Sequence, residues 1–279
     1  MVIDSHCHIL PPGFEQRRAD LLARDATFAA LFSKAGAPMA TAEALIDAMD
    51  RARVSRAVVM GMGWCDRALA GEVNDYIAES VARYPDRLSG FCSVNPAWGD
   101  GAAAEVVRCA AAGLRGVGEL HPDTQGFDIT DKPGLTPVMD TVMRLGLPVL
   151  VHSSEPVGHL YPGKGRTTPG KLYCFIENFP ENPVICAHWG GGLPFYAMMP
   201  EVSKVIQNVY FDMAASPFLY RSQVVATVAG LVGADKVLFA TDYPLIQHGR
   251  LIRQVKGSGL DSSDQGAILG GNAARLLGL

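Results

Sequence analysis

The stretch LPVLVHSS, residues 147–154, is a short apolar run that ends in a histidine and two serines. Such a run is typical of a strand that is buried on both faces, as the strands of a parallel sheet are. A polar side chain at its carboxyl end would lie at the edge of the sheet where α/β barrels build their sites. The fold depends on how many such strands the chain contains and on what separates them.

Seven further runs share this character: 2–6, 54–62, 87–96, 114–122, 183–192, 208–216 and 236–244. The segments with helical spacing between and after them are 41–52, 70–85, 102–113, 135–146, 172–180, 195–206, 221–233 and 262–278. Several end at Gly or Pro, which are helix stop signals. A doubly wound sheet would usually show a Gly-rich phosphate turn after an early strand, and none is present. The pattern predicts an α/β fold, a (β/α)8 TIM barrel.

The length of the chain fits one barrel. A (β/α)8 domain typically needs about 250 residues, and this chain has 279, so we expect a single domain over residues 1–279. Two connections, 9–40 and 155–170, are too long to be simple turns. Both follow a strand, and we expect them to lie over the active-site face as lids or binding loops.

Composition limits the partners. The chain is 48% apolar and 19% charged, its net charge is −4, and no Lys/Arg cluster forms a stripe, which argues against nucleic acid. No secretory signal and no apolar run of membrane-spanning length are visible. The six cysteines form no CxxC pair and are expected to be reduced. We expect a cytoplasmic protein whose partner is a small molecule.

Six residues that can bind a metal lie late in the predicted strands. They are His6, His8, Glu119, His152, His188 and Asp242. Because the carboxyl ends of barrel strands meet at one rim, we expect these side chains to converge on one cavity. His6 and His8 are two residues apart on a strand, so both imidazoles point to the same face and can bind one ion.

Simpler roles exist for these residues. The histidines of strands five and six could be hydrogen-bonded core residues, and Asp242 could cap a helix. Glu119 could be a buried carboxylate paired with a cation, because burying it unpaired would be costly. His121 could neighbour the site or lie in a loop, and Asp212 could orient a ligating histidine.

Taken together, four features resemble the amidohydrolase superfamily. They are DSHCH at 4–8, the late-strand histidines at 152 and 188, FATDYP at 239–244, and the terminal GGNAARLLGL at 270–279. Within the superfamily, the chain is most similar to the amidohydrolase-related family that includes aminocarboxymuconate-semialdehyde decarboxylase. The resemblance runs from residue 3 to residue 279.

The resemblance implies roles for five residues. His6, His8 and His152 resemble the metal-ligating histidines. Asp242 resembles the aspartate that binds the metal and exchanges protons with its water. His188 resembles a catalytic residue or second metal ligand.

The fourth strand departs from a common pattern of the superfamily. Many amidohydrolases carry a carboxylated lysine there, whereas this chain has Glu119. A glutamate at this place is similar to the one that bridges two metals in TatD-like members, so the number of ions is one or two. We favour zinc as the cofactor, although manganese, iron and nickel suit the same ligands.

These features favour a metal-dependent hydrolase that acts on a C–O or C–N bond of a lactone, ester or amide through a metal-activated water. The alternative is a non-oxidative decarboxylase of an aromatic or muconate-type acid, in which His188 or Asp242 protonates the carbon. Glu119 favours hydrolysis, because an extra anionic ligand suits a metal hydroxide and opposes an acidic substrate. A barrel that only binds a ligand is the third possibility, and the intact ligand set argues against it.

Specificity is expected to lie in the long loops. His159, Tyr161 and Arg166 are candidate substrate-binding residues on the loop after the fifth strand. Met198 and Met199, in an apolar run, could pack against a second subunit in a homodimer.

Overall fold

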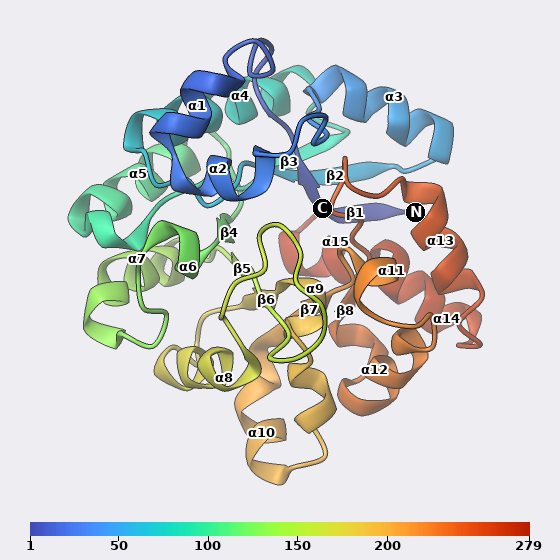
Figure 1. Ribbon diagram of the computed structural model, residues 1–279. Coiled ribbons are helices and arrows are strands. Elements are labelled where there is room, and N and C mark those ends of the chain that lie inside the picture. The colour runs from blue at the N-terminus through green and yellow to red at the C-terminus, as the bar shows by residue number, and fades with distance from the viewer.

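A computed structural model describes residues 1–279, and eight parallel strands lie at its centre (Figure 1). They are β1 Ile3–His8, β2 Arg56–Met60, β3 Leu88–Gly90, β4 Val117–Leu120, β5 Val149–Val151, β6 Val184–Cys186, β7 Val209–Asp212 and β8 Val237–Leu238. Strands β1–β3 and β4–β8 pair in sequence order, and the bridges Cys7–Tyr243 and Cys92–Val117 close the two gaps. The predicted (β/α)8 barrel is confirmed.

Helices form the layer around the strands (Figure 1). They are α1 Arg18–Arg24, α2 Ala26–Phe32, α3 Ala42–Ala52, α4 Arg67–Arg83, α5 Asp100–Ala111, α6 Pro122–Gln125, α7 Lys132–Leu145, α8 Pro169–Asn178, α9 Ala187–Gly190, α10 Pro200–Val205, α11 Ser216–Leu219, α12 Val224–Val232, α13 His248–Lys256, α14 Ser262–Gly266 and α15 Asn272–Leu277. Each predicted helical segment overlaps at least one of them. Among the helices that were not predicted is α13, although its buried Leu251 and Val255 have the i, i+4 spacing of an amphipathic helix.

Two predicted helices are interrupted. The segment 195–206 starts as a short 3-10 turn, Leu193–Tyr196, and α10 begins only at Pro200. Proline has no backbone N–H, so it fits the first turn of a helix and breaks the interior of one. The segment 262–278 divides into α14 and α15 around a wider turn, Ala267–Gly271.

The barrel interior is a packed apolar layer. Ile3, Val58, Leu150, Ile185 and Leu238 come from five strands and belong to one buried cluster, each at most 1% exposed. Residues from α15 join this cluster, so the helix covers one end of the barrel. The polar side chains at the carboxyl ends of the strands therefore stand on a solid floor, as is usual for this fold.

The two long connections reach the carboxyl side of the strands. Segment 9–40 holds α1 and α2, and the loop after β5 crosses in front of the central strands in Figure 1, where it is yellow-green. Residues from both segments line one cavity. Elsewhere on the surface Met198 and Met199 are 82% and 49% exposed, and a dimer through them stays a prediction. None of the helices combines the length and apolar character that a bilayer span requires.

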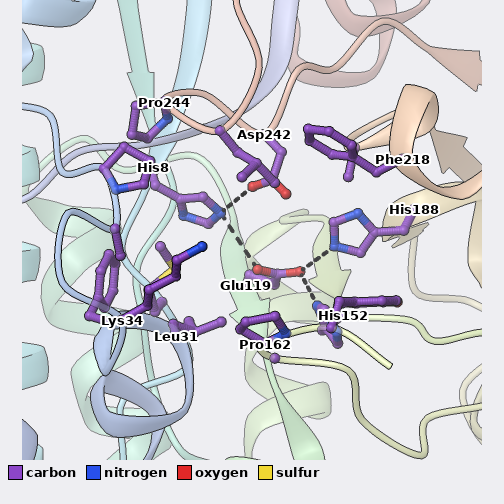
Figure 2. Close-up of a pocket in the computed structure, with 18 of the residues that line it drawn as sticks. His8, Leu31, Lys34, Glu119, His152, Pro162, His188, Phe218, Asp242 and Pro244 are labelled. Atoms are coloured by element: carbon purple, nitrogen blue, oxygen red, sulfur yellow. Dashed lines mark hydrogen bonds and ion pairs between the residues drawn. The ribbon is translucent and has the colours of Figure 1, made fainter. Parts of the chain in front are cut away.

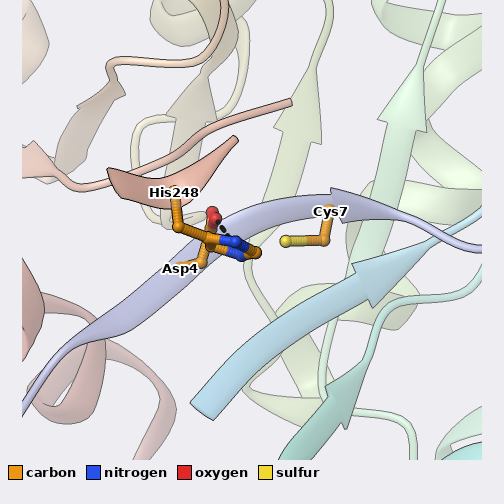
Figure 3. Close-up of side chains that lie close together, drawn as sticks. All are labelled: Asp4, Cys7 and His248. Atoms are coloured by element: carbon orange, nitrogen blue, oxygen red, sulfur yellow. Dashed lines mark ion pairs between the residues drawn. The ribbon is translucent and has the colours of Figure 1, made fainter. Parts of the chain in front are cut away.

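Asp4 joins the first strand to the last. Its carboxylate is fully buried and accepts hydrogen bonds from the backbone N–H of His6 at 3.2 Å and of Thr241 at 3.0 Å. The Thr241 hydroxyl donates a third, at 2.5 Å. Figure 3 shows His248 beside this carboxylate, with Nε2 3.2 Å from Oδ2, and Cys7 nearby on the same strand. Burial raises the pKa of Asp4, and these donors offset part of that cost.

Asp4→Ala is expected to lower the free energy of unfolding by about 3 kcal/mol, because it leaves buried donors of His6 and Thr241 unpaired. Thermal or urea unfolding would measure it. Asp86→Ala is the matched control, since that carboxylate is 96% exposed and its ion pair with Arg56 is long, at 3.7 Å. This substitution should change the free energy of unfolding by less than about 0.5 kcal/mol. Equal stability of the two variants would contradict the role given to Asp4.

Candidate active site

All six predicted metal-binding residues meet at the carboxyl ends of the strands. Five of them, all but His6, line a cavity of about 620 Å³ (Figure 2), and His6 lies against His8. His6 and His8 are in β1, Glu119 is in β4, and His152 directly follows β5. His188 lies in α9, two residues after β6, and Asp242 lies four residues after β8. Five of the six are buried, and the Asp242 side chain is 15% exposed. Barrel closure therefore brings together residues that are up to 236 positions apart in the sequence.

His6 and His8 present bare nitrogen lone pairs to each other. His6 Nδ1 is 2.8 Å from Asp212 Oδ2, and His8 Nδ1 is 3.0 Å from the Gly61 carbonyl. Both partners are acceptors, so both Nδ1 atoms carry the proton and each neutral ring keeps its lone pair on Nε2. The two Nε2 atoms are 3.0 Å apart. Two lone pairs at this distance need a positive charge between them.

Two carboxylates flank these nitrogens. Asp242 Oδ1 is 3.2 Å from His8 Nε2 and 3.9 Å from His6 Nε2. Glu119 Oε2 is 3.6 Å and 3.7 Å from the same two atoms. Tetrahedral ligands bound at about 2.1 Å stand roughly 3.4 Å from one another. The donor set therefore fits a divalent cation, in charge and in spacing.

The electrostatic field at the His6 and His8 nitrogens favours a positive charge there. Burial disfavours a charged imidazole at His6, but Asp212 and Glu119 outweigh it and raise the pKa of His6 well above its usual value. Burial would raise the pKa of Glu119, yet His152 and His6 hold it well below the ordinary value. The same centre that attracts a proton will attract a metal ion, which displaces that proton.

Glu119 also contacts the second pair of histidines. Its other oxygen, Oε1, is 2.9 Å from His152 Nδ1 and 3.5 Å from His188 Nε2. The dashed lines of Figure 2 show this carboxylate between His8 on one side and His152 and His188 on the other. Burial opposes charge on His188, but the hydrogen bond to Glu119 and the Asp242 carboxylate raise its pKa to about 9.

Asp212 holds two parts of the site together, as the partner of a ligating histidine would. Besides His6, it accepts the backbone N–H of His188 at 2.8 Å and of Ala214 at 3.0 Å. His188 has φ of +55°, in the left-handed region that non-glycine residues rarely adopt. Gly191 follows three residues on, and a Cβ there would lie 2.5 Å from the Ser154 carbonyl oxygen. The HWGGG turn therefore requires glycine at position 191 to pass the segment that follows β5.

The three candidate substrate-binding residues do not all line the cavity. His159 and Tyr161 line the cavity, but Arg166 does not, and its side chain is 91% exposed. The backbone N–H of Arg166 donates a hydrogen bond to the Asp123 carboxylate, and the guanidinium Nε lies 3.8 Å from the same carboxylate. Arg166 therefore points away from the cavity in this structure, and its role in substrate binding stays a prediction.

His121 lies at the site and not in a remote loop. Its ring stacks on His152 with centroids 4.0 Å apart, and its Nε2 donates to the Gly163 carbonyl at 3.0 Å. Burial lowers the pKa of His121 to about 3, so the ring stays neutral. Lys34 and Phe218 also line the cavity, and the sequence pattern did not predict them. Neither lies at a strand end, so no spacing signal identifies them.

Comparisons with known proteins agree with this architecture. The sequence profile of the amidohydrolase family matches residues 3–279. A 2-amino-3-carboxymuconate-6-semialdehyde decarboxylase of Dictyostelium discoideum is 26% identical over 243 residues, which cover 76% of this chain and 67% of the relative. A gamma-resorcylate decarboxylase of Polaromonas is 24% identical over 257 residues, covering 75% and 76% of the two chains.

Solved structures share the fold. A 5-carboxyvanillate decarboxylase of Sphingomonas paucimobilis superposes with a TM-score of 0.80 at 17% identity, covering 100% of this chain and 99% of that one. A second 5-carboxyvanillate decarboxylase, from Novosphingobium aromaticivorans, gives 0.78 at 17% identity, covering 100% and 96%. That protein is complexed with manganese and 4-hydroxy-3-methoxy-5-nitrobenzoic acid.

The expectation of a hydrolase is wrong, because the relatives are decarboxylases. Glu119 does not favour hydrolysis, for a physical reason. Its charge is already compensated by the imidazoles of His6, His152 and His188, so it does not oppose an acidic substrate. Zinc is likewise not singled out, since the donor set suits several divalent ions. The match over residues 3–279 shows that the chain belongs to the amidohydrolase family of enzymes.

Proposed function

We propose that the protein is a metal-dependent, non-oxidative decarboxylase of an aromatic or muconate-type carboxylic acid. The observation that carries this proposal is the all-acceptor cluster of His6, His8, Glu119 and Asp242 at the floor of the cavity. The names of the relatives supply the reaction class. Phe218 and Leu31 from the walls give the cavity an apolar surface against which a flat ring can pack.

One divalent ion is proposed, held by His6, His8, Glu119 and Asp242. The remaining two histidines share the other oxygen of Glu119 and orient it. When bound, the metal would hold and polarise the oxygen atoms of the acid. Manganese is the first ion to test, because a structural neighbour contains it, and zinc is the second.

The reaction requires one proton. The bond between the ring carbon and the carboxylate breaks, carbon dioxide leaves, and the electron pair that stays on the carbon takes up a proton. We assign this donation to His188, whose Nδ1 is 3.2 Å from the Ala214 carbonyl and whose Nε2 faces the cavity floor. With its pKa raised to about 9, the ring carries a proton on Nε2 at neutral pH.

Purified protein loaded with manganese or zinc is expected to release carbon dioxide from 2,6-dihydroxybenzoate or 5-carboxyvanillate, the acids on which the neighbours act. In deuterium oxide the product should carry one deuterium at the carbon that lost the carboxylate. Mass spectrometry of the product checks both points. Absence of carbon dioxide release from a panel of aromatic and muconate-type acids, with metal bound, would refute the proposed reaction.

His8→Ala should reduce the bound metal from one ion per chain to well below that, because it removes one of two facing lone pairs. Elemental analysis after dialysis measures the ratio. His159→Ala is the control, since this exposed histidine has no contact with the cluster, and it should retain the full metal content. Two ions per wild-type chain would contradict the single-ion proposal.

His188→Asn should lower kcat by a factor of about 10²–10⁴ while the metal content stays at the wild-type level, as expected for loss of a general acid. Asp242→Asn should instead lower the metal content. If His188→Asn keeps its kcat, the proton comes from another group, and the assignment is wrong.

A further inference from the structure

Lys34 is the one lysine or arginine that lines the cavity. It lies two residues after α2, in the segment between β1 and α3. In Figure 2 its side chain extends into the cavity and its ammonium group points toward the space between His8 and Glu119. A single positive charge therefore faces the cluster across the cavity.

The backbone at this position is held in place. The Arg18 guanidinium donates to the carbonyls of Phe32 at 2.7 Å, Lys34 at 3.3 Å and Ala37 at 3.1 Å. Its other contact is an ion pair with Glu15 at 2.6 Å. Arg18 thus fixes the loop from inside the protein, so the Lys34 side chain starts from a defined point at the cavity wall.

The ammonium group itself has no partner in the protein. No carboxylate lies within 4.0 Å of it, and it donates no hydrogen bond. The nearby carboxylates, Glu119 and Asp242, are engaged with imidazoles. By contrast, Lys164 on the opposite loop donates to the carbonyls of Val157 and His159. Lys34 is therefore the cation that remains available to a ligand in the cavity.

We propose that Lys34 selects substrates with a second acidic group, so that the substrate is a dicarboxylate. This inference rests on the proposed function, which places the departing carboxylate at the cluster. The second carboxylate then meets Lys34 while the ring lies between them against Phe218 and Leu31. Charge complementarity favours this arrangement, because the exposed ammonium group at the cavity wall attracts a second carboxylate and offers a monoacid no matching contact.

Binding tests the proposal without requiring turnover. The probes are 4-hydroxy-3-methoxy-5-nitrobenzoate and 2-methoxy-6-nitrophenol, which differ only by the carboxylate that Lys34 would hold. Calorimetry on manganese-loaded wild-type protein should show at least about tenfold tighter binding of the acid. Lys34→Met should remove this difference, and Lys34→Arg should retain most of it. Lys256→Met is the control, because it removes the same charge at an exposed position outside the cavity.

Three results would overturn the proposal: equal affinity for both probes, no binding of either, or an equal loss for both in Lys34→Met. The last would mean that Lys34 holds the group at the reacting end. A kinetic comparison adds the substrate pair 5-carboxyvanillate and 2-hydroxy-3-methoxybenzoate, and Lys34→Met should raise KM for the diacid alone. If no acid is decarboxylated, the proposed function fails, while the binding comparison still decides the role of Lys34.

Discussion

The closure of the barrel at Asp4 is the constraint on which the site depends. This buried carboxylate accepts two N–H groups and one hydroxyl, and the donors belong to His6 and Thr241. Each donor residue is adjacent to or part of the metal-binding set, since Asp242 follows Thr241. The Asp242 backbone N–H also donates to the His6 carbonyl at 3.0 Å. The geometry that holds strands β1 and β8 together therefore also sets the distance between two proposed ligands.

The charges of the side chains at the cavity floor decide what the site can bind. The imidazole tautomers that Asp212 and Gly61 impose leave two lone pairs face to face, and two carboxylates stand beside them. Such a cluster is stable only with a cation or extra protons. The positively charged centre that results can accept a carboxylate, and the compensated charge of Glu119 offers no barrier to one. An acidic substrate is therefore compatible with this floor.

Part of this could be predicted because the signals are local. Apolar runs bounded by turn residues identified the eight strands, and polar residues late in five of them identified the six converging side chains. Local contacts also set where individual loop side chains point. Arg166 is in the right loop, but the hydrogen bond to Asp123 fixes its backbone with the side chain outward. The opposite holds for Lys34, which has an unremarkable sequence setting and enters the cavity because Arg18 holds its loop.

The sequence by itself determined the barrel, the identity of the converging residues and the family, because strand periodicity and residue type need no knowledge of the fold. Only the tertiary structure decided how those residues share their charges. It showed that Glu119 uses one oxygen for His6 and His8 and the other for His152 and His188. That sharing depends on distances between strands that are far apart in the chain, and no local pattern encodes such distances.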